Sequence, residues 1–379
     1  MDAFSVRTKI MIGGGMDALA QRLHRVFLVT DKFMAESGKT NYVTDRLLRN
    51  GGEFKIFSDV QADPDIATVT RGVEQILEFQ PDAVVAFGGG SAIDAAKAIV
   101  FFAARERDMR GLQVHRHPHH QRHRLGGEPL CGDHRPGEGG SNIPLVEDSL
   151  LPDIAILDAE LTTSVPPTVT ADTGIDVFTH AVEAFVSTEA SDFSDAAAEK
   201  AIKLVKRHLL PAYQNPEDRK ARQGHAQRLL PGGHRLLQLR PGPQPRHGPR
   251  PGRRFHIPSG PGPNGILLPY VMSFNAGCAE QLTSTAKRYA RISRLLELES
   301  SSVRQSALNL IRTARRYIEK LNMPSTLQAA GVNAAEFEEA VHDMAEAALA
   351  DRCTATNPRS CTAEEIEQIF RKAYSGKLP

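Results

Sequence analysis

The chain of 379 residues has no tryptophan, few cysteines and no apolar run long enough to span a bilayer. Its four cysteines show no paired spacing, so we expect a reducing compartment. No signal peptide precedes the first expected strand. Neither sign of charge is in excess, since the formal net charge is +1, which gives no reason to expect nucleic acid or a membrane as partner. These absences predict a cytoplasmic protein.

Residues 1–110 of the domain expected over 1–163 alternate between short apolar runs and helical patterns, which is typical of repeated β-α units in a doubly wound parallel sheet. The apolar runs have the length and composition of buried parallel strands. The expected strands are Arg25–Thr30, Phe54–Phe57 and Ala83–Phe87. One expected helix follows the first strand and ends near Asn50, and two others span Asp65–Phe79 and Ala92–Ala104. This pattern predicts a Rossmann-like α/β domain that binds a dinucleotide.

From Ser164 onward the periodicity is helical, and no strand-like alternation of comparable quality occurs. The clearest helical segments are Asp192–Leu209, Gln281–Leu298, Ser302–Leu321, Ala334–Leu349 and Thr362–Ser375. The predicted fold class is therefore α/β followed by all-α, with the helical domain over 164–379. A cleft between two such domains is a natural ligand site.

A glycine-rich turn, Gly88-Gly89-Gly90-Ser91, follows the third expected strand and leads into a helix whose first turn is expected to hold Asp94. Glycine lets the backbone approach phosphate groups, and a helix N-terminus offers free N–H donors and a favourable dipole. GGGS alone is a weak motif that also suits a plain tight turn. Its place between a buried strand and a helix favours cofactor binding.

Asp31 ends the first buried strand, where a carboxylate can accept a hydrogen bond from a ribose. Such a carboxylate favours NAD over NADP because it repels a 2′-phosphate. A helix cap is an equally good interpretation of Asp31. A second glycine cluster, Gly13-Gly14-Gly15, is interpreted as a turn at a strand end.

Asp176 and His180 lie four residues apart in Thr170–Phe185 (TADTGIDVFTHAVEAF), which has the pattern of an amphipathic helix. That spacing places both side chains on one helix face, one turn apart. A carboxylate and an imidazole presented together can bind a first-row divalent metal. On spacing alone, a capping or solvated Asp beside a core His is the favoured interpretation.

Two segments, Leu112–Ser141 and Arg222–Pro263, differ from everything around them. They hold ten of the 14 histidines and no lysine, and nine of the 24 prolines lie between Pro231 and Pro263. One interpretation is a pair of basic loops that bind metal or nucleic acid. Structureless loops of this length are uncommon in compact domains, which favours a different explanation.

Several stretches together resemble the iron-containing alcohol dehydrogenase family, and within it the short-chain members such as the 1-propanol dehydrogenases. The stretches are GGGSAIDAAKAI (Gly88–Ile99), LPDIAILDAEL (Leu151–Leu161), the TADTGIDVFTHAVEAF stretch, FHIP…GILLPYV (Phe255–Val271) and NPR (Asn357–Arg359). The resemblance covers nearly all of the chain outside the two segments.

The resemblance implies a divalent iron held by an Asp and a His one helical turn apart, matched by Asp176 and His180, and by two further histidines. The third ligand would lie near Pro245–Arg246 and the fourth at Ser259, and neither position carries histidine as written. His256 is not the family's ligand. Two of the four ligands are therefore absent from the written chain.

The resemblance further implies hydride transfer between NAD and a short primary alcohol such as 1-propanol, giving the aldehyde, with the metal polarising the oxygen. The cofactor would lie along Gly88–Ser91 with Asp31 at the ribose. The partners implied are a small alcohol or aldehyde, a second copy of the chain in a homodimer, and a setting compatible with a microcompartment. Neither nucleic acid nor a membrane is implied.

Three alternatives stay open. Zinc would also fit such a ligand set, as in a polyol dehydrogenase of the same superfamily. A chain that exists as written, with half a metal site, would be an inactive scaffold or binding protein. A nucleic-acid-binding role for the Arg/His segments is disfavoured, because they lack the interleaved aromatic residues of a stacking surface.

Both anomalous segments lie where the family carries glycine-rich and histidine-rich motifs, and both can be translated one base out of frame. Taking the last two bases of each codon with the first of the next, His117–Glu128 permits IPTTSGTGSEV, the family's loop between GGGS and LPD. The same offset lets Pro243–Arg254 give LNHGMAHALGG. The written histidines then arise from codons for other residues, and both segments would be irregular or poorly packed.

We predict that the underlying gene sequence is frameshifted in both segments, with the reading frame left and restored within each. Resequencing the gene across both segments should show compensating insertions or deletions that restore the family's motifs. An uninterrupted reading frame that gives the residues as written would end this explanation.

Overall fold

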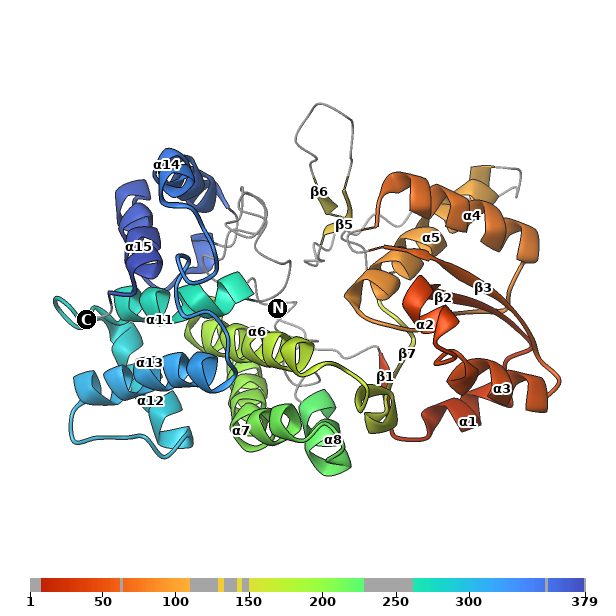
Figure 1. Cartoon of the computed structure of the whole chain (residues 1–379), viewed down its shortest axis with the longest axis horizontal. Helices are drawn as coiled ribbons and strands as arrows, with labels where there is room; N and C mark the ends of the chain where they lie inside the picture. The colour runs from red at the N-terminus through yellow and green to blue at the C-terminus, as the bar shows by residue number, and fades with distance from the viewer. Residues whose placement is uncertain are drawn as a thin grey trace. The chain divides into compact units, whose positions relative to one another are not determined.

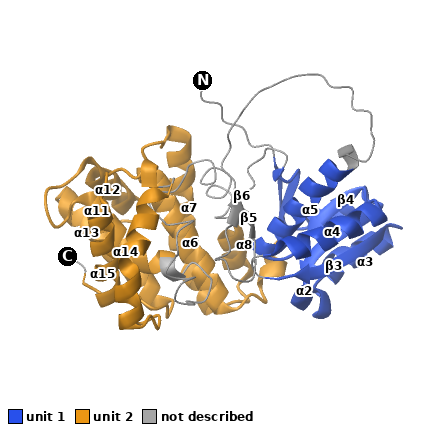
Figure 2. Cartoon of the chain, turned by 90° about the horizontal axis from the view of Figure 1, so that it is seen from above, with its two compact units in different colours: residues 1–157 blue, residues 158–379 orange. Residues whose placement is uncertain are grey.

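The computed structural model describes residues 8–61, 64–109, 129–132, 142–144, 150–227, 262–351 and 354–377. The chain forms two compact units, residues 1–157 and 158–379 (Figure 2). The sequence places the division after residue 163, six residues later. No helix in the described ranges is long and apolar enough to cross a membrane.

The first unit is built on a parallel sheet of three strands, β2 (Arg25–Asp31), β3 (Glu53–Val60) and β4 (Ala83–Ala86), in the order β3-β2-β4. Strands β2 and β3 are labelled in Figure 1 and β4 in Figure 2. The central strand β2 is buried from Val26 to Thr30, as its apolar run predicts. Strand β4 was expected to be fully buried. It is half-buried with Ala86 exposed, because it forms an edge of this sheet.

Helices cover both faces of this sheet. The crossover from β2 to β3 runs through α2 (Lys32–Glu36) and α3 (Asn41–Arg49), while α4 (Ile66–Phe79) and α5 (Gly90–Met109) pack together (Figure 1). A Cβ at Gly72 of α4 would lie 2.3 Å from Ile99 Cδ1 of α5, so a larger residue there would displace the Ile99 side chain.

The remaining strands of the first unit form two separate pairs. They are β1 (Lys9–Ile12) with β7 (Ile154–Leu157), parallel, and β5 (Pro129–Gly132) with β6 (Asn142–Pro144), antiparallel. The turn Gly13–Gly15 joins β1 to α1 (Gly15–Ala20), and Gly13 has a φ of 69°. The interpretation of this cluster as a strand-end turn is therefore confirmed.

The described residues of the second unit are helical, with two short 3-10 turns, as the periodicity after Ser164 predicts. The helices are α6 (Pro167–Val186), α7 (Asp192–Gln214), α8 (Arg219–Gln227), α11 (Gly262–Ala276), α12 (Ser284–Leu295), α13 (Val303–Lys320), α14 (Ala334–Ala350) and α15 (Ala363–Ser375), and the turns are Ala159–Thr162 and Thr354–Thr356. One apolar core joins α6, α7, α12 and α13, and a second joins α11, α14 and α15.

Helix α6 packs closely against two neighbours, and each contact depends on a glycine. A Cβ at Gly174 of α6 would lie 2.1 Å from Leu209 Cδ1 of α7, and a Cβ at Gly265 of α11 would lie 2.7 Å from Ile175 Cγ2 of α6. Pro167 at the first helical position suits the start of α6, where its missing N–H is not needed.

The structure departs from the expected irregularity in parts of both anomalous segments. Pro129–Gly132 forms the regular strand β5, Arg222–Gln227 completes helix α8, and Gly262–Pro263 begins α11. The rest of both segments, including the expected sites of the third and fourth metal ligands, lies outside the described residues. The frameshift explanation stays a prediction.

Arg222 is buried, with 1% of its surface exposed, and attaches α8 to the start of α6. Its guanidinium donates to Thr170 Oγ1 (2.6 Å), to the Val165 carbonyl (3.1 Å) and to the Pro216 carbonyl (3.1 Å). Burial lowers the pKa of Arg222, and the charge of Glu217 opposes that shift. This set of bonds gives a basic residue of the anomalous segment a defined structural role.

We predict that Arg222→Met destabilises the helical unit by roughly 3 kcal/mol, about 6–12 °C in unfolding temperature, because the buried Thr170 hydroxyl and two partly buried carbonyls lose their donor. Arg219→Met, on the exposed side of the same helix, should change the free energy of unfolding by less than about 0.5 kcal/mol. Thermal unfolding followed by circular dichroism measures both. Equal stability of the two variants would contradict the buried position of Arg222.

Candidate functional site

Asp176 and His180 face each other along α6. His180 Nε2 lies 3.5 Å from Asp176 Oδ1, and 20% and 34% of the two side chains are exposed. The pair is thus partly open to solvent on a helix whose remaining surface is largely buried. The geometry brings a carboxylate oxygen and an imidazole nitrogen to one point, which the spacing of four residues predicts.

Two further side chains shape the surroundings of Asp176. Asn264, at the start of α11, donates from Nδ2 to Asp176 Oδ1 at 3.1 Å and fixes that carboxylate. Burial raises the pKa of the Asp172 carboxyl, and the charge of Asp176 raises it further. Two carboxylates that repel each other create a negative potential on this face, which favours a cation. The sequence carried no signal for Asn264, since its contact spans two helices.

Glu183 lies on the other side of the His180 ring, with Oε2 at 3.8 Å from Nδ1 and 7% of its side chain exposed. Spacing could have found this residue, because positions i and i+3 share a helix face. The sequence signal that could have identified Glu183 is a charged residue among the apolar positions of this helix.

Only two of the expected metal ligands fall within the described residues. In those ranges, no three His, Cys, Asp or Glu side chains gather into a group that could hold a metal ion. Asp176 and His180 nevertheless match the oxygen and nitrogen donors that divalent iron and zinc accept. The pair therefore fits half of a four-ligand site.

The NPR motif braces the same unit from its C-terminal side. Asn357 and Asn275 of α11 exchange two buried side-chain hydrogen bonds of 2.8 and 2.9 Å. Arg359 donates to the Phe274 carbonyl at 2.9 Å and lies 4.0 Å above the Phe274 ring. The motif thus joins the segment before α15 to α11, and its role in this structure is structural.

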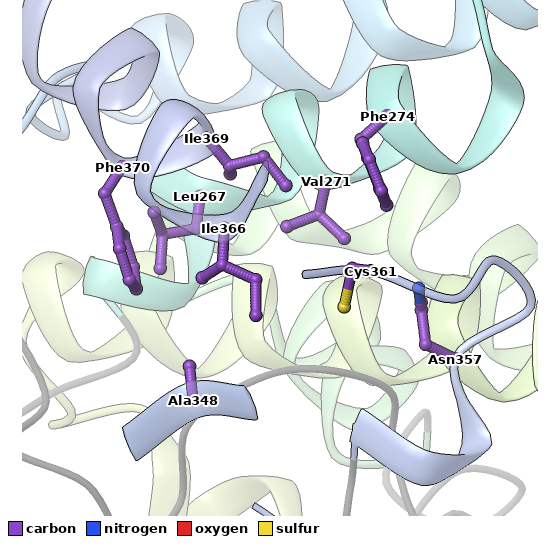
Figure 3. Close-up of a pocket in the computed structure, with 9 residues that line it drawn as sticks. All are labelled: Leu267, Val271, Phe274, Ala348, Asn357, Cys361, Ile366, Ile369 and Phe370. Carbon is purple, nitrogen blue, oxygen red and sulfur yellow. The ribbon is translucent and has the colours of Figure 1, made fainter. Parts of the chain in front are cut away.

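Small cavities are lined by described residues of the second unit, and two are large enough to consider. One, of about 20 Å³, is lined by apolar side chains of α11 and α15 with Cys361 and Asn357 at one side (Figure 3). The other, of about 10 Å³, includes Glu183, Asn275 and Tyr289 in its wall. Each is about the size that one water molecule needs, so neither admits an alcohol together with a cofactor.

In the first unit, the glycine turn and Asp31 come together as the sequence predicts. Strands β2 and β4 are parallel neighbours, and a Cβ at Gly88 would lie 3.5 Å from Asp31 Oδ2. The buried Thr30 hydroxyl donates to the Phe87 carbonyl at 2.7 Å, which ties the two strand ends together. Because β3 and β4 lie on opposite sides of β2, this edge is a topological switch point, where α/β sheets bind ligands.

The local structure at this edge refines three expectations. Asp31 is the N-cap of α2 and accepts from the Met34 N–H at 2.8 Å, so the capping interpretation holds. Helix α5 begins at Gly90, two residues earlier than expected, which places Ser91 in its first turn and Asp94 just beyond it. Among the described residues, nothing lies within 4 Å of a Cβ placed at Gly89 or Gly90, so no described side chain fills the space beside the helix N-terminus.

Comparisons with known proteins cover both units. A family model described as "Iron-containing alcohol dehydrogenase" matches residues 8–125, and one described as "Fe-containing alcohol dehydrogenase family, C-terminal" matches residues 170–374. The first range includes Asp31 and the glycine turn, and the second includes Asp176 and His180.

Among similar proteins, 1-propanol dehydrogenase PduQ of Salmonella typhimurium is 35% identical over 98% of this chain and 100% of its own length. The NADPH-dependent butanol dehydrogenase of Clostridium saccharobutylicum is 32% identical over 90% of this chain and 89% of its own. A solved structure of iron-containing alcohol dehydrogenase from Thermococcus thioreducens matches with a TM-score of 0.82 and 27% identity, covering 99% of this chain and 100% of that one.

Proposed function

The chain belongs to the iron-containing alcohol dehydrogenase family, and on that premise we propose that it interconverts a short primary alcohol, such as 1-propanol, and its aldehyde with NAD and Fe²⁺. That it is an alcohol dehydrogenase follows from the family and from relatives of known activity over the whole chain. An inactive scaffold and a nucleic-acid-binding protein, the alternatives left by the sequence, are not favoured by these relatives.

The observation that carries the proposal is the pairing of Asp176 Oδ1 with His180 Nε2 at 3.5 Å on α6. These two residues would hold the metal, and Asn264 would orient the carboxylate. When bound, such an ion supplies Lewis-acid polarisation of the alcohol or carbonyl oxygen. Iron is proposed over zinc because the matching family models describe iron-containing enzymes.

The cofactor site is proposed at the switch point of the first sheet. The space at Gly89 and Gly90, which no described side chain fills, lies next to the N-terminus of the 20-residue helix α5 and suits a phosphate group. Asp31 Oδ1 caps α2, whereas Oδ2 lies toward Gly88 and is the atom proposed to accept from a ribose hydroxyl. NAD supplies the hydride acceptor when bound.

The preference for 1-propanol rests on the relatives named as 1-propanol dehydrogenases. A homodimer and association with a microcompartment are carried over from the same resemblance, and a cytoplasmic location is proposed from the cysteine pattern and the lack of a long apolar run. Aldehyde reduction by NADH is the direction proposed for the cell.

We predict that Asp176→Asn and His180→Gln each abolish metal binding and lower kcat/KM at least about a thousandfold, because Lewis-acid stabilisation is worth several kcal/mol. The protein is expressed from the resequenced gene and loaded with Fe²⁺ without oxygen. Metal per chain is measured by elemental analysis, and activity by NADH oxidation with propionaldehyde.

The control for these two variants is Asp192→Asn, which removes a carboxylate from the exposed first turn of α7. It should retain both metal and activity. A wild-type protein that binds one iron per chain yet keeps it in Asp176→Asn would show that the metal lies elsewhere. Failure of the wild type to oxidise NADH with any short aldehyde would overturn the proposed reaction.

For the cofactor we predict that Asp31→Asn raises kcat/KM for NADPH relative to NADH by about tenfold. Asparagine still caps α2 but no longer repels a 2′-phosphate. Asp65→Asn is a matched control, since Asp65 caps α4 in the same way through the Thr68 N–H. Its coenzyme ratio should stay that of the wild type, and an unchanged ratio in Asp31→Asn would remove Asp31 from the cofactor site.

A further inference from the structure

The imidazole of His180 lies between two carboxylates of its own helix. Nε2 faces Asp176 Oδ1 at 3.5 Å, and Nδ1 faces Glu183 Oε2 at 3.8 Å. A neutral imidazole carries one proton, and the nitrogen that carries it cannot bind a metal. Which carboxylate attracts that proton therefore decides whether Nε2 is available beside Asp176.

The two carboxylates differ in their surroundings. The Glu183 side chain is 7% exposed, whereas that of Asp176 is 34% exposed. Charge acts more strongly in the less hydrated environment. The Oδ1 atom of Asp176 already accepts a hydrogen bond from Asn264 at 3.1 Å. A proton on His180 Nε2 would therefore have to share this acceptor. Both differences favour the proton on Nδ1, toward Glu183.

Glu183 lies in the wall of a small cavity beside two buried asparagines that bond to each other. Its side chain forms the wall of the 10 Å³ cavity together with Asn275, Tyr289 and Asn357. Asn275 and Asn357 are fixed by their reciprocal hydrogen bonds. Burial raises the pKa of Tyr289, a hydrogen bond with Asn275 opposes this, and the charge of Glu183 raises it further. The phenol therefore stays protonated beside the carboxylate.

A purely structural role explains Glu183 poorly. Removing a carboxylate from water costs several kcal/mol, and an apolar side chain of similar length would fill the same place at a lower cost. A role of this charge at Nδ1 of His180 explains why a carboxylate is kept here despite that cost. A shift of about 0.6 Å would bring Oε2 and Nδ1 from 3.8 Å to hydrogen-bonding distance.

We propose that Glu183 is a positioning residue that keeps the His180 proton on Nδ1 and so presents the Nε2 lone pair to the ion at Asp176. The carboxylate acts through His180 and does not itself bind the metal. Ligand histidines are commonly oriented in this way by a carboxylate on their second nitrogen. This assignment rests on the proposed function, because it takes Asp176 and His180 of α6 as metal ligands.

The first test is a two-bond ¹H–¹⁵N correlation spectrum of the full chain with labelled histidine and a chelator, about two pH units above the ordinary histidine pKa. The His180 signal is identified by its loss in His180→Gln. The expected result in the wild type is a ring with its proton on Nδ1. A wild-type ring protonated on Nε2 overturns the proposal without any variant of Glu183.

Substitution then assigns the effect to Glu183. Glu183→Met should move the proton to Nε2, since Asp176 is then the one of the two carboxylates that still faces the ring. Glu183→Gln should leave it on Nδ1, because the amide oxygen still accepts. Glu199→Met removes a partly buried carboxylate that pairs with Arg291 on a neighbouring helix, and it should leave the His180 signal unchanged. A ring unchanged in Glu183→Met would overturn the assignment.

A second measurement separates this inference from the proposed function. In a chelator competition, Glu183→Met should bind Fe²⁺ about 10–100-fold more weakly than the wild type, and Glu183→Gln should keep most of the affinity. Equal affinity in Glu183→Met and the wild type would contradict a positioning role. If the wild type binds no Fe²⁺, the proposed function fails. The tautomer of His180 in the wild type and in Glu183→Met would still show whether Glu183 holds the proton on Nδ1.

Discussion

Close packing of α6 is the constraint on which the candidate metal site depends. Thirteen of its 20 residues are buried, and the lack of a Cβ at Gly174 of α6 and Gly265 of α11 leaves room for the facing side chains of Leu209 and Ile175. A helix held this way cannot rotate about its axis without opening voids. Its partly exposed positions are therefore fixed, and the face that carries Asp176 and His180 follows from what the other face buries.

In the first unit, too, close packing of secondary-structure elements fixes the candidate site. Gly72 lets α4 and α5 pack together, and the central position of β2 places its carboxyl end beside that of β4. Asp31 and Gly88, far apart in the chain, become neighbours at that edge. In both units an acidic residue and its partner are held by packing of the apolar surface behind them, so stability and site geometry have the same origin.

Much of this architecture could be predicted, because long periodic segments such as α13 and α14 were found with nearly their observed ends. Shorter or edge elements were harder. Strand β4 is less buried than its four apolar residues suggest, since burial depends on which strands flank it. Helix α8 is not predicted by the sequence, because it is anchored by a buried arginine, Arg222, and lacks an apolar stripe.

The sequence by itself determined the local geometry. Four residues of helix bring Asp176 beside His180, and a strand followed by GGGS and a helix builds a glycine-rich helix N-terminus at Gly89, because backbone periodicity sets both. Tertiary structure decided what reaches these groups from elsewhere in the chain. Asn264 contacts Asp176 across 88 residues, and Asn357 contacts Asn275 across 82. Such contacts have no periodicity, so only the packed helices reveal them.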